Sequence, residues 1–194
     1  MKRTLLGILI LASVSCGDLT RQGTGSSYLT IESLEASSGA APGAFAAGLS
    51  SDVVTVVDGT PTVFADLARV SFALLLKDTG PPGSPNTPSP NNAITVDRYR
   101  VVYLRADGRN TPGVDVPFPF DGAFTVTVFD RATAGFTLVR GQAKLEAPLA
   151  ALRNNFSTIS TIAEVTFYGR DQTGRQVSVT GRLDVSFSNF GDPN

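Results

Sequence analysis

The stretch that decides the fold runs from residue 161 to residue 187 and reads TIAEVTFYGRDQTGRQVSVTGRLDVSF. Apolar and polar residues alternate on both sides of a central turn sequence, DQTG at 171–174. A period of two residues is typical of a strand with one buried face, and a Gly-containing turn between two such strands indicates a β-hairpin. We therefore predict antiparallel strands over 161–168 and 176–187, with one inward face formed by Val177, Val179, Leu183, Val185 and Phe187.

The rest of the chain repeats this strand pattern between turn residues. Val, Thr, Phe and Ser recur in short runs that Gly, Pro, Asn and Asp interrupt, as in domains built from many short strands. Asp58-Gly59 is a turn pair, and Pro148 favours one short helical turn over 146–152. Further strands are predicted over 28–34, 52–57, 67–77, 94–105, 123–129 and 136–144, with a proline-containing restart at 116–120 and a loop over 38–51. An all-β domain of about eight strands follows.

Residues 78–92 are the least core-like part of the predicted domain. They read DTGPPGSPNTPSPNN, with five prolines and no aliphatic side chain. A segment of this composition cannot bury apolar area. We predict a surface loop between two strands of a single domain.

The composition of the chain excludes several classes of chemistry. The 194 residues contain no His and no Trp, and the sulfur-containing residues are Met1 and Cys16. Imidazole acid–base catalysis, Ser-His-Asp and Cys-His nucleophiles, and His or Cys zinc sites are therefore excluded within the chain. The formal net charge of −1 gives no electrostatic reason to expect nucleic acid as a partner. No cofactor is expected.

The N-terminus has the organisation of an export signal. Lys2 and Arg3 precede the apolar stretch LLGILILASV at 5–14, which is too short to span a bilayer as a helix. The sequence that follows, SVSC at 13–16, resembles the lipobox of bacterial lipoproteins, in which cleavage occurs before a lipid-modified cysteine. This resemblance implies a signal peptide over 1–15 and lipidation of Cys16. An ordinary signal peptide cut at the same bond is the alternative.

The single cysteine favours the lipoprotein interpretation. An exported chain with Cys16 at its new N-terminus would carry an unpaired, oxidisable thiol, whereas lipidation gives that thiol a role. The polar residues 16–27 then form a tether, 28–188 the β-domain and 189–194 a C-terminal tail. We expect an exported protein that is anchored at the cell membrane or outer membrane through lipid on Cys16, with its domain outside the cytoplasm.

Two further resemblances bear on the fold. About eight strands, a helical turn before the penultimate strand and a long closing hairpin resemble the immunoglobulin and fibronectin-III-like β-sandwiches of bacterial surface proteins. The resemblance covers residues 28–187 and implies an antiparallel sandwich. The segments RYRVVYLRADGRN at 98–110 and AEVTFYGRDQTGR at 163–175 are similar to those of uncharacterised bacterial lipoproteins, a likeness that implies no activity.

One surface stands out as a candidate binding face. Sandwiches of this kind place the strands containing 98–103, 161–168 and 177–187 side by side. If their apolar positions point inward, the period of two residues sends a charged set outward together: Arg98, Arg100, Glu164, Tyr168, Arg182 and Asp184. We name this set the charged face. It is either a ladder of cross-strand ion pairs or a surface that binds a partner.

Two other groups of acids deserve comparison with known chemistry. Asp107, Asp115 and Asp121 lie near turns, where sandwich domains often build calcium sites, but their spacing matches no calcium loop. Glu146 and Glu164 are the two acids that a glycosidase mechanism would need. The leading hypothesis is a non-catalytic envelope lipoprotein that binds or scaffolds another envelope component. A glycan- or polymer-binding module is the alternative, and a carboxylate-dependent hydrolase ranks last.

Overall fold

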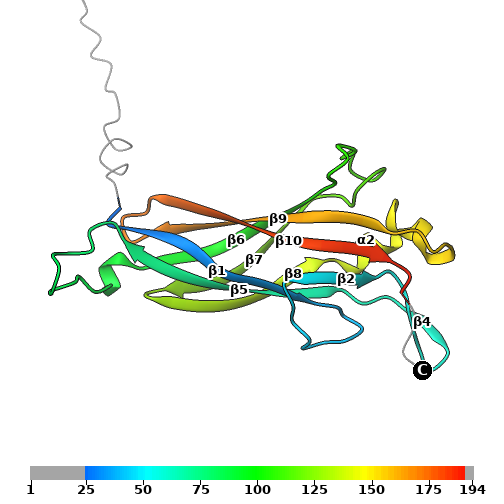
Figure 1. Ribbon diagram of the computed structural model, residues 1–194, viewed down its shortest axis with the longest axis horizontal. Helices are drawn as coiled ribbons and strands as arrows, with labels where there is room; N and C mark the ends of the chain where they lie inside the picture. The colour runs from blue at the N-terminus through cyan, green and yellow to red at the C-terminus, as the bar shows by residue number, and fades with distance from the viewer. Residues whose placement is uncertain (1–24, 191–194) are drawn as a thin grey trace, which may run out of the picture.

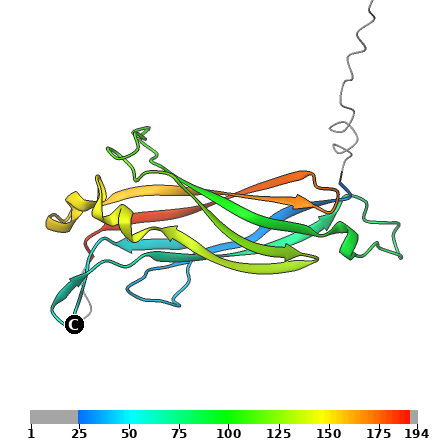
Figure 2. The ribbon, with the colours of Figure 1, turned by 180° about the vertical axis from the view of Figure 1, so that it is seen from behind.

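The computed structural model describes residues 25–190 (Figures 1 and 2). The predicted signal peptide, the predicted lipidation site at Cys16 and most of the predicted tether lie outside these residues. Three short helices, η1 (Pro90–Asn92), α2 (Gly141–Leu145) and η2 (Leu149–Asn154), accompany ten strands in the described chain. The strands are β1 (Ser27–Ser37), β2 (Gly48–Asp52), β3 (Thr55–Val57), β4 (Thr60–Thr62), β5 (Asp66–Leu76), β6 (Ile94–Leu104), β7 (Phe120–Val128), β8 (Arg131–Val139), β9 (Ile159–Asp171) and β10 (Gln176–Ser188).

The strands form three sheets. One sheet has the order β1-β5-β8, a larger one has the order β2-β10-β9-β6-β7, and β3 and β4 form a small hairpin. All pairings are antiparallel except that of β2, which runs parallel to β10. The prediction of an all-β fold is confirmed. The predicted hairpin is the pair β9–β10, with thirteen residues in each strand.

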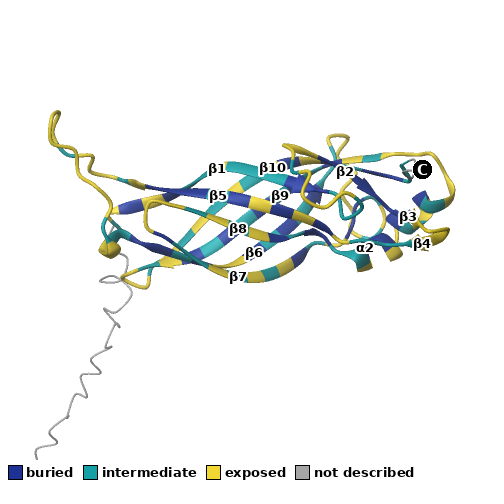
Figure 3. Ribbon diagram, turned by 90° about the horizontal axis from the view of Figure 1, so that it is seen from below, coloured by how far each residue is buried: buried dark blue, intermediate teal, exposed yellow. Residues whose placement is uncertain are grey.

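The core lies between the inward faces of the three- and five-stranded sheets. Buried and exposed residues alternate along most strands, as expected from side chains that point to opposite faces (Figure 3). Aromatic rings connect the layers: Phe72 of β5 lies 5.1 Å from Phe167 of β9, and Phe136 of β8 lies 4.9 Å from Tyr99 of β6. Burying one such ring contributes about 1.5–3 kcal/mol. These contacts hold the two sheets together.

The region between β1 and β5 differs from the prediction. Residues 38–51 were expected to be loop, but Gly48–Asp52 forms β2. The predicted strand 52–57 is split, because β2 follows β10 to its end and the Val53 amide donates to the Ser188 carbonyl at 3.0 Å. The chain then turns into the β3–β4 hairpin at the predicted Asp58-Gly59 pair, where both residues have positive φ.

The predicted strand 136–144 is wrong in both its start and its end. β8 begins at Arg131, where small residues with weak strand propensity pair with β5. It ends at Val139, and Gly141–Leu145 forms α2. The helix carries Lys144 inward to a buried carboxylate, a contact that local pattern cannot reveal. The predicted helical turn at 146–152 is present slightly later, as η2.

The two ends of the domain carry different elements. The start of β1 pairs with the end of β5, so the described chain begins at the same end as the loop over 77–93 and the β9–β10 turn (Figure 1). The proline-rich segment 78–92 lies in that loop, as predicted, and is largely exposed. At the opposite end lie the loop over 105–119, the helices α2 and η2 and the β3–β4 hairpin (Figure 1).

Candidate functional site

The six residues of the charged face lie together on the outer side of the five-stranded sheet. Arg98 of β6 is the register partner of Tyr168 of β9, and Arg182 of β10 is the partner of Glu164. Most of their neighbours along each strand are buried, among them Tyr99, Val101, Ala163, Val165, Phe167, Leu183 and Val185. The shared surface that the sequence predicts is therefore present. Whether it binds a partner is a separate question.

Ion pairs occupy the middle of the charged face. Arg182 Nη2 lies 2.8 Å from Glu164 Oε2, and Arg100 Nη1 lies 2.8 Å from Asp121 Oδ2 of β7. Exposed cross-strand pairs of this kind contribute about 0.2–1 kcal/mol each. Asp184 is exposed beside Gly48 of β2. This part of the surface thus has the geometry of a charge ladder.

A β-bulge interrupts strand β6 at one end of the charged face. The register shifts between Val96 and Arg98 in the pairings with both neighbouring strands. Against β9, Asp97 is the extra residue, whereas against β7 the extra residue lies on β7, between Ala123 and Val126. Val96 and Tyr99 are both buried, while Asp97 and Arg98 are both exposed. A bulge re-aims side chains in this way. Here it places two successive charged residues on the same outer surface.

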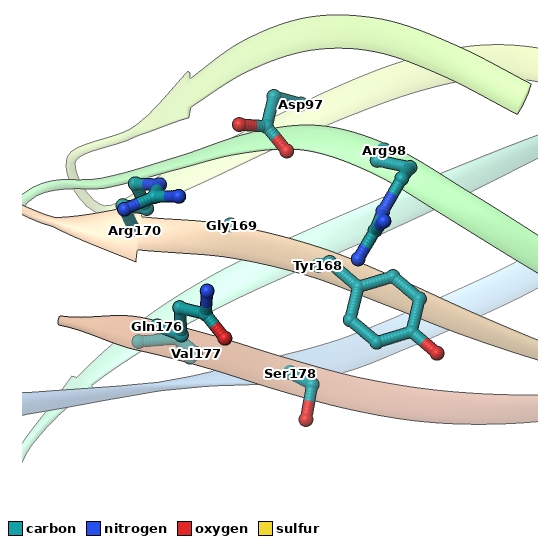
Figure 4. A pocket seen from close by; sticks show the side chains of 8 residues that line it. All are labelled: Asp97, Arg98, Tyr168, Gly169, Arg170, Gln176, Val177 and Ser178. Atoms are coloured by element: carbon teal, nitrogen blue, oxygen red, sulfur yellow. The ribbon is translucent and has the colours of Figure 1, made fainter.

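Next to the bulge the outer surface is hollowed. We name this depression, of about 410 Å³, the bulge hollow. Seven residues with side chains, from three strands, line it: Asp97, Arg98, Tyr168, Arg170, Gln176, Val177 and Ser178 (Figure 4). Gly169 contributes backbone, and a Cβ there would lie 2.3 Å from the Thr95 carbonyl oxygen, so β6 and β9 approach closely only because this residue is glycine.

The two arginines of the bulge hollow differ from those of the ladder. Within residues 25–190, neither Arg98 nor Arg170 forms an ion pair. The Arg98 guanidinium lies over the Tyr168 ring, 4.5 Å from its centroid, a cation–π contact that leaves its charge uncompensated. Figure 4 shows Arg170 and Gln176 at one end of the hollow, Arg98 over Tyr168 at the other, and Asp97 on β6 between the two arginines. These groups can bind an anion that also carries hydroxyls.

Sequence reasoning found Arg98 and Tyr168 but missed Asp97, Arg170, Gln176 and Ser178. A signal was present. In ITVDRYRVVYL at 94–104, Ile94 and Val96 occupy even positions, whereas Tyr99, Val101 and Tyr103 occupy odd positions beside the apolar Val102 and Leu104. Because the strand period is two, this change of phase indicates an extra residue between them.

The three candidate calcium ligands are engaged separately. Asp107 Oδ2 pairs with Arg105 at 2.6 Å and with Arg109 at 2.9 Å, and the hydrogen bond from Arg105 is the main reason that the pKa of Asp107 is strongly lowered. Asp115 accepts a hydrogen bond from the Thr111 amide, and Asp121 pairs with Arg100. Among the described residues, no group of three acids, cysteines or histidines could hold a metal ion.

The imagined glycosidase pair has no shared location. Glu146 follows α2 and accepts a hydrogen bond from Gln142 Nε2 at 2.8 Å. Glu164 lies in the middle of β9 and pairs with Arg182. Each carboxylate therefore has a partner on its own element or the adjacent strand, and no hollow found in the described chain is lined by both.

Two of the four tyrosines are unavailable as surface platforms. Tyr99 and Tyr103 are buried, and burial is the main cause of the raised pKa of each phenol. The Tyr103 hydroxyl donates to the Leu138 carbonyl at 2.6 Å. Tyr28 and Tyr168 remain at the surface, on different sheets, and Arg98 already covers part of the Tyr168 ring.

Comparisons with known proteins do not assign a family. No family model matches the chain, and no curated protein matches it. One solved structure, titled "X-ray structure of Northeast Structural Genomics Consortium target SoR45", is 9% identical and aligns over 82% of this chain and 86% of that chain, with a TM-score of 0.36. A likeness at this level carries no functional argument. In residues 25–190, no helix is long and apolar enough to cross a membrane.

Proposed function

We propose that this protein is a lipid-anchored, non-catalytic binding module of the cell envelope, which holds another envelope component against its charged face. One observation carries the proposal: three neighbouring strands present Arg98, Arg100, Tyr168 and Arg182 on a single outer surface. Arg and Tyr are residue types that dominate binding energy at interfaces. The ion pairs of the ladder support this use of the face, because they fix its long side chains before a partner arrives.

The chemistry of the side chains supports a binding role rather than catalysis. The chain contains no His, and its one cysteine is placed for lipidation. Of the acids that could replace imidazole, Glu164 is paired with Arg182 and Asp107 with Arg105, and the hydrogen bond from Arg105 lowers the pKa of Asp107. A binding function requires no proton transfer by any of these side chains.

The strand orders support an immunoglobulin-like sandwich as the finer description of the fold. In that family one sheet contains strands A, B and E in neighbouring order, and the other contains C, F and G. The orders β1-β5-β8 and β10-β9-β6 correspond to these two sets, with α2 and η2 between the strands in the positions of E and F.

The role of the charged face can be tested by neutralising two of its arginines. Arg98→Ser with Arg100→Ser should abolish capture of the envelope partner from solubilised membranes while the melting temperature falls by no more than about 4 °C, because each side chain is at the surface. Chemical cross-linking followed by pulldown measures capture of the partner, and thermal melting measures the stability of the variant. Arg131→Ser is the matched control, since it removes an exposed ion pair with Glu32 from the outer side of the other sheet.

A larger loss of melting temperature with capture unchanged would contradict the proposal. It would show that the charged face is a stabilising ladder only. A separate binding surface would then have to be sought elsewhere on the domain.

A further inference from the structure

We propose that the bulge hollow binds an acidic saccharide, in which Arg170 recognises the carboxylate of a uronic acid unit and Arg98, over Tyr168 at the other end of the hollow, contacts its hydroxyl groups. This inference rests on the proposed function, because it names a ligand class for one end of the charged face. Its elements are the bulge at Asp97, the two unpaired guanidiniums and the polar groups that surround them.

The bulge is the first argument for a built site. Without an extra residue, alternation would turn either Asp97 or Arg98 toward the core. The bulge instead exposes both, beside the outward residues Tyr168 and Arg170 of β9. Gly169, between these two, allows the β6 backbone to come close enough for side chains of both strands to line one hollow. Bulges occur disproportionately next to functional sites for this reason.

The unpaired charge is the second argument. Arg69, Arg100, Arg105, Arg109, Arg131 and Arg182 all form ion pairs with carboxylates in the described structure. Among the described arginines, Arg98, Arg140, Arg153, Arg170 and Arg175 do not, and of these five Arg98 and Arg170 line the same hollow. A guanidinium fork matches the geometry of a planar carboxylate, and such charge-assisted pairs are about twice as strong as neutral hydrogen bonds.

The balance of charge selects the kind of anion. Two arginines and Asp97 give the bulge hollow a formal charge of about +1, which a single carboxylate neutralises and a doubly charged phosphate exceeds. Asp97 accepts hydrogen bonds only, while the Gln176 amide and the Ser178 hydroxyl can both donate and accept. A ligand with hydroxyl groups next to one carboxylate satisfies all of these groups, and a uronic acid has this composition.

The central strand of the hollow, β9, has no free edge for an extended peptide, whereas β10 is paired with β2 only over Asp184–Ser188. β9 lies between β10 and β6, so its backbone is already paired on both sides and cannot add a peptide strand. Recognition over β9 therefore depends on side chains over a small concave surface. Its volume of about 410 Å³ falls in the range of small-ligand sites.

The test is calorimetric titration of the purified full chain in detergent at low salt. The probe is a galacturonate trimer, and a neutral galactose trimer, inorganic phosphate and a pentaglutamate peptide are titrated in parallel. We expect the galacturonate trimer to bind at least about tenfold more tightly than the neutral trimer, and Arg170→Gln to weaken its binding about tenfold or more. Arg131→Gln on the opposite sheet should change it less than about twofold.

Two results would overturn the inference. Equal affinity for both trimers, or none, would show that the carboxylate is not recognised. Equal affinity for pentaglutamate or phosphate would show a general attraction of anions. If Arg170→Gln fails to fold, Gln176→Ala on the exposed start of β10 replaces it, with the same expected weakening. A protein partner captured through the charged face without galacturonate binding would sink this inference and leave the proposed function standing.

Discussion

A buried ion pair is the most consequential single contact in the described domain. The side chains of Lys144 and Asp66 are 1% and 0% exposed, and their charged atoms lie 2.9 Å apart. Lys144 Nζ also donates to the Asp52 carbonyl, and the Asp66 carboxylate accepts hydrogen bonds from Ser51 Oγ and the Gly39 amide. The pair thereby ties α2 to β5, β2 and the loop after β1.

Removing the lysine should be far more damaging than an ordinary surface substitution. Lys144→Met keeps much of the side-chain volume but leaves the Asp66 carboxylate buried without its counter-ion. We expect a loss of about 3–5 kcal/mol in the free energy of unfolding, measured by urea denaturation.

A double variant provides the control for this prediction. Adding Asp66→Asn to Lys144→Met removes both charges and should recover part of the lost stability, because no uncompensated charge remains. A loss below about 1 kcal/mol for Lys144→Met alone would mean that the pair contributes no more than a surface ion pair does.

The orientation of a side chain could be predicted from the sequence where it depends on one strand, and could not where it depends on residues far away in the chain. The outward position of Arg98, Arg100 and Glu164 could be predicted because period two depends on a single strand. The burial of Lys144 could not, since a lysine after a strand is normally solvated and its partner Asp66 is distant in the sequence. Arg170 was missed because its role depends on the bulge in another strand.

At the scale of elements, strands with strong alternation were predicted well. β1, β5, β6 and the β9–β10 hairpin cover the predicted strands except Lys77 and Arg105, and most of their apolar residues lie inward, Leu67 and Leu75 being exposed. β2 and β8 were missed wholly or in part because Gly, Ser and Ala dominate them, so that their pairing depends on neighbouring strands rather than on their own side chains.

The proline-rich loop over 78–92 should contribute little to the stability of the domain. Replacing residues 79–89 with a short Gly/Ser linker, while retaining η1, should shift the melting temperature by less than about 4 °C, because the closure entropy changes by only about 0.6 kcal/mol per doubling of loop length. η1 is retained because the Asn92 carbonyl accepts a hydrogen bond from Ser27 Oγ at 2.7 Å. Circular dichroism melting measures the shift, and a fall of more than about 10 °C would show that the loop packs on the domain.

At the scale of the whole molecule, the two ends of the domain differ. The described chain begins beside the loop over 77–93, and the bulge hollow lies on the half of the charged face toward that end (Figure 1). An anchor at Cys16 would therefore hold the hollow close to the membrane surface. The lipid is part of the proposal, and it can be tested independently of the ligand.

Cys16→Ser should release a folded protein from membranes. We expect the variant to leave the membrane fraction after a salt wash and to melt at the same temperature as the parent domain, because Cys16 precedes the described residues and no second cysteine exists to pair with it. Fractionation followed by thermal melting checks both statements. A variant that stays with the membrane after the wash would show that lipid on this residue is not the anchor.

The most direct test of the account places a photo-reactive amino acid on each sheet in living cells. Thr166 lies at the centre of the charged face and Thr133 on the outer side of the other sheet, and each hydrogen-bonds to a neighbouring hydroxyl at 2.9 and 3.0 Å. The two positions are therefore matched in residue type and setting. If the charged face binds an envelope component, we expect a cross-link to that component from position 166 and none from position 133. A cross-link from position 133 alone would contradict the assignment of the charged face as the binding surface.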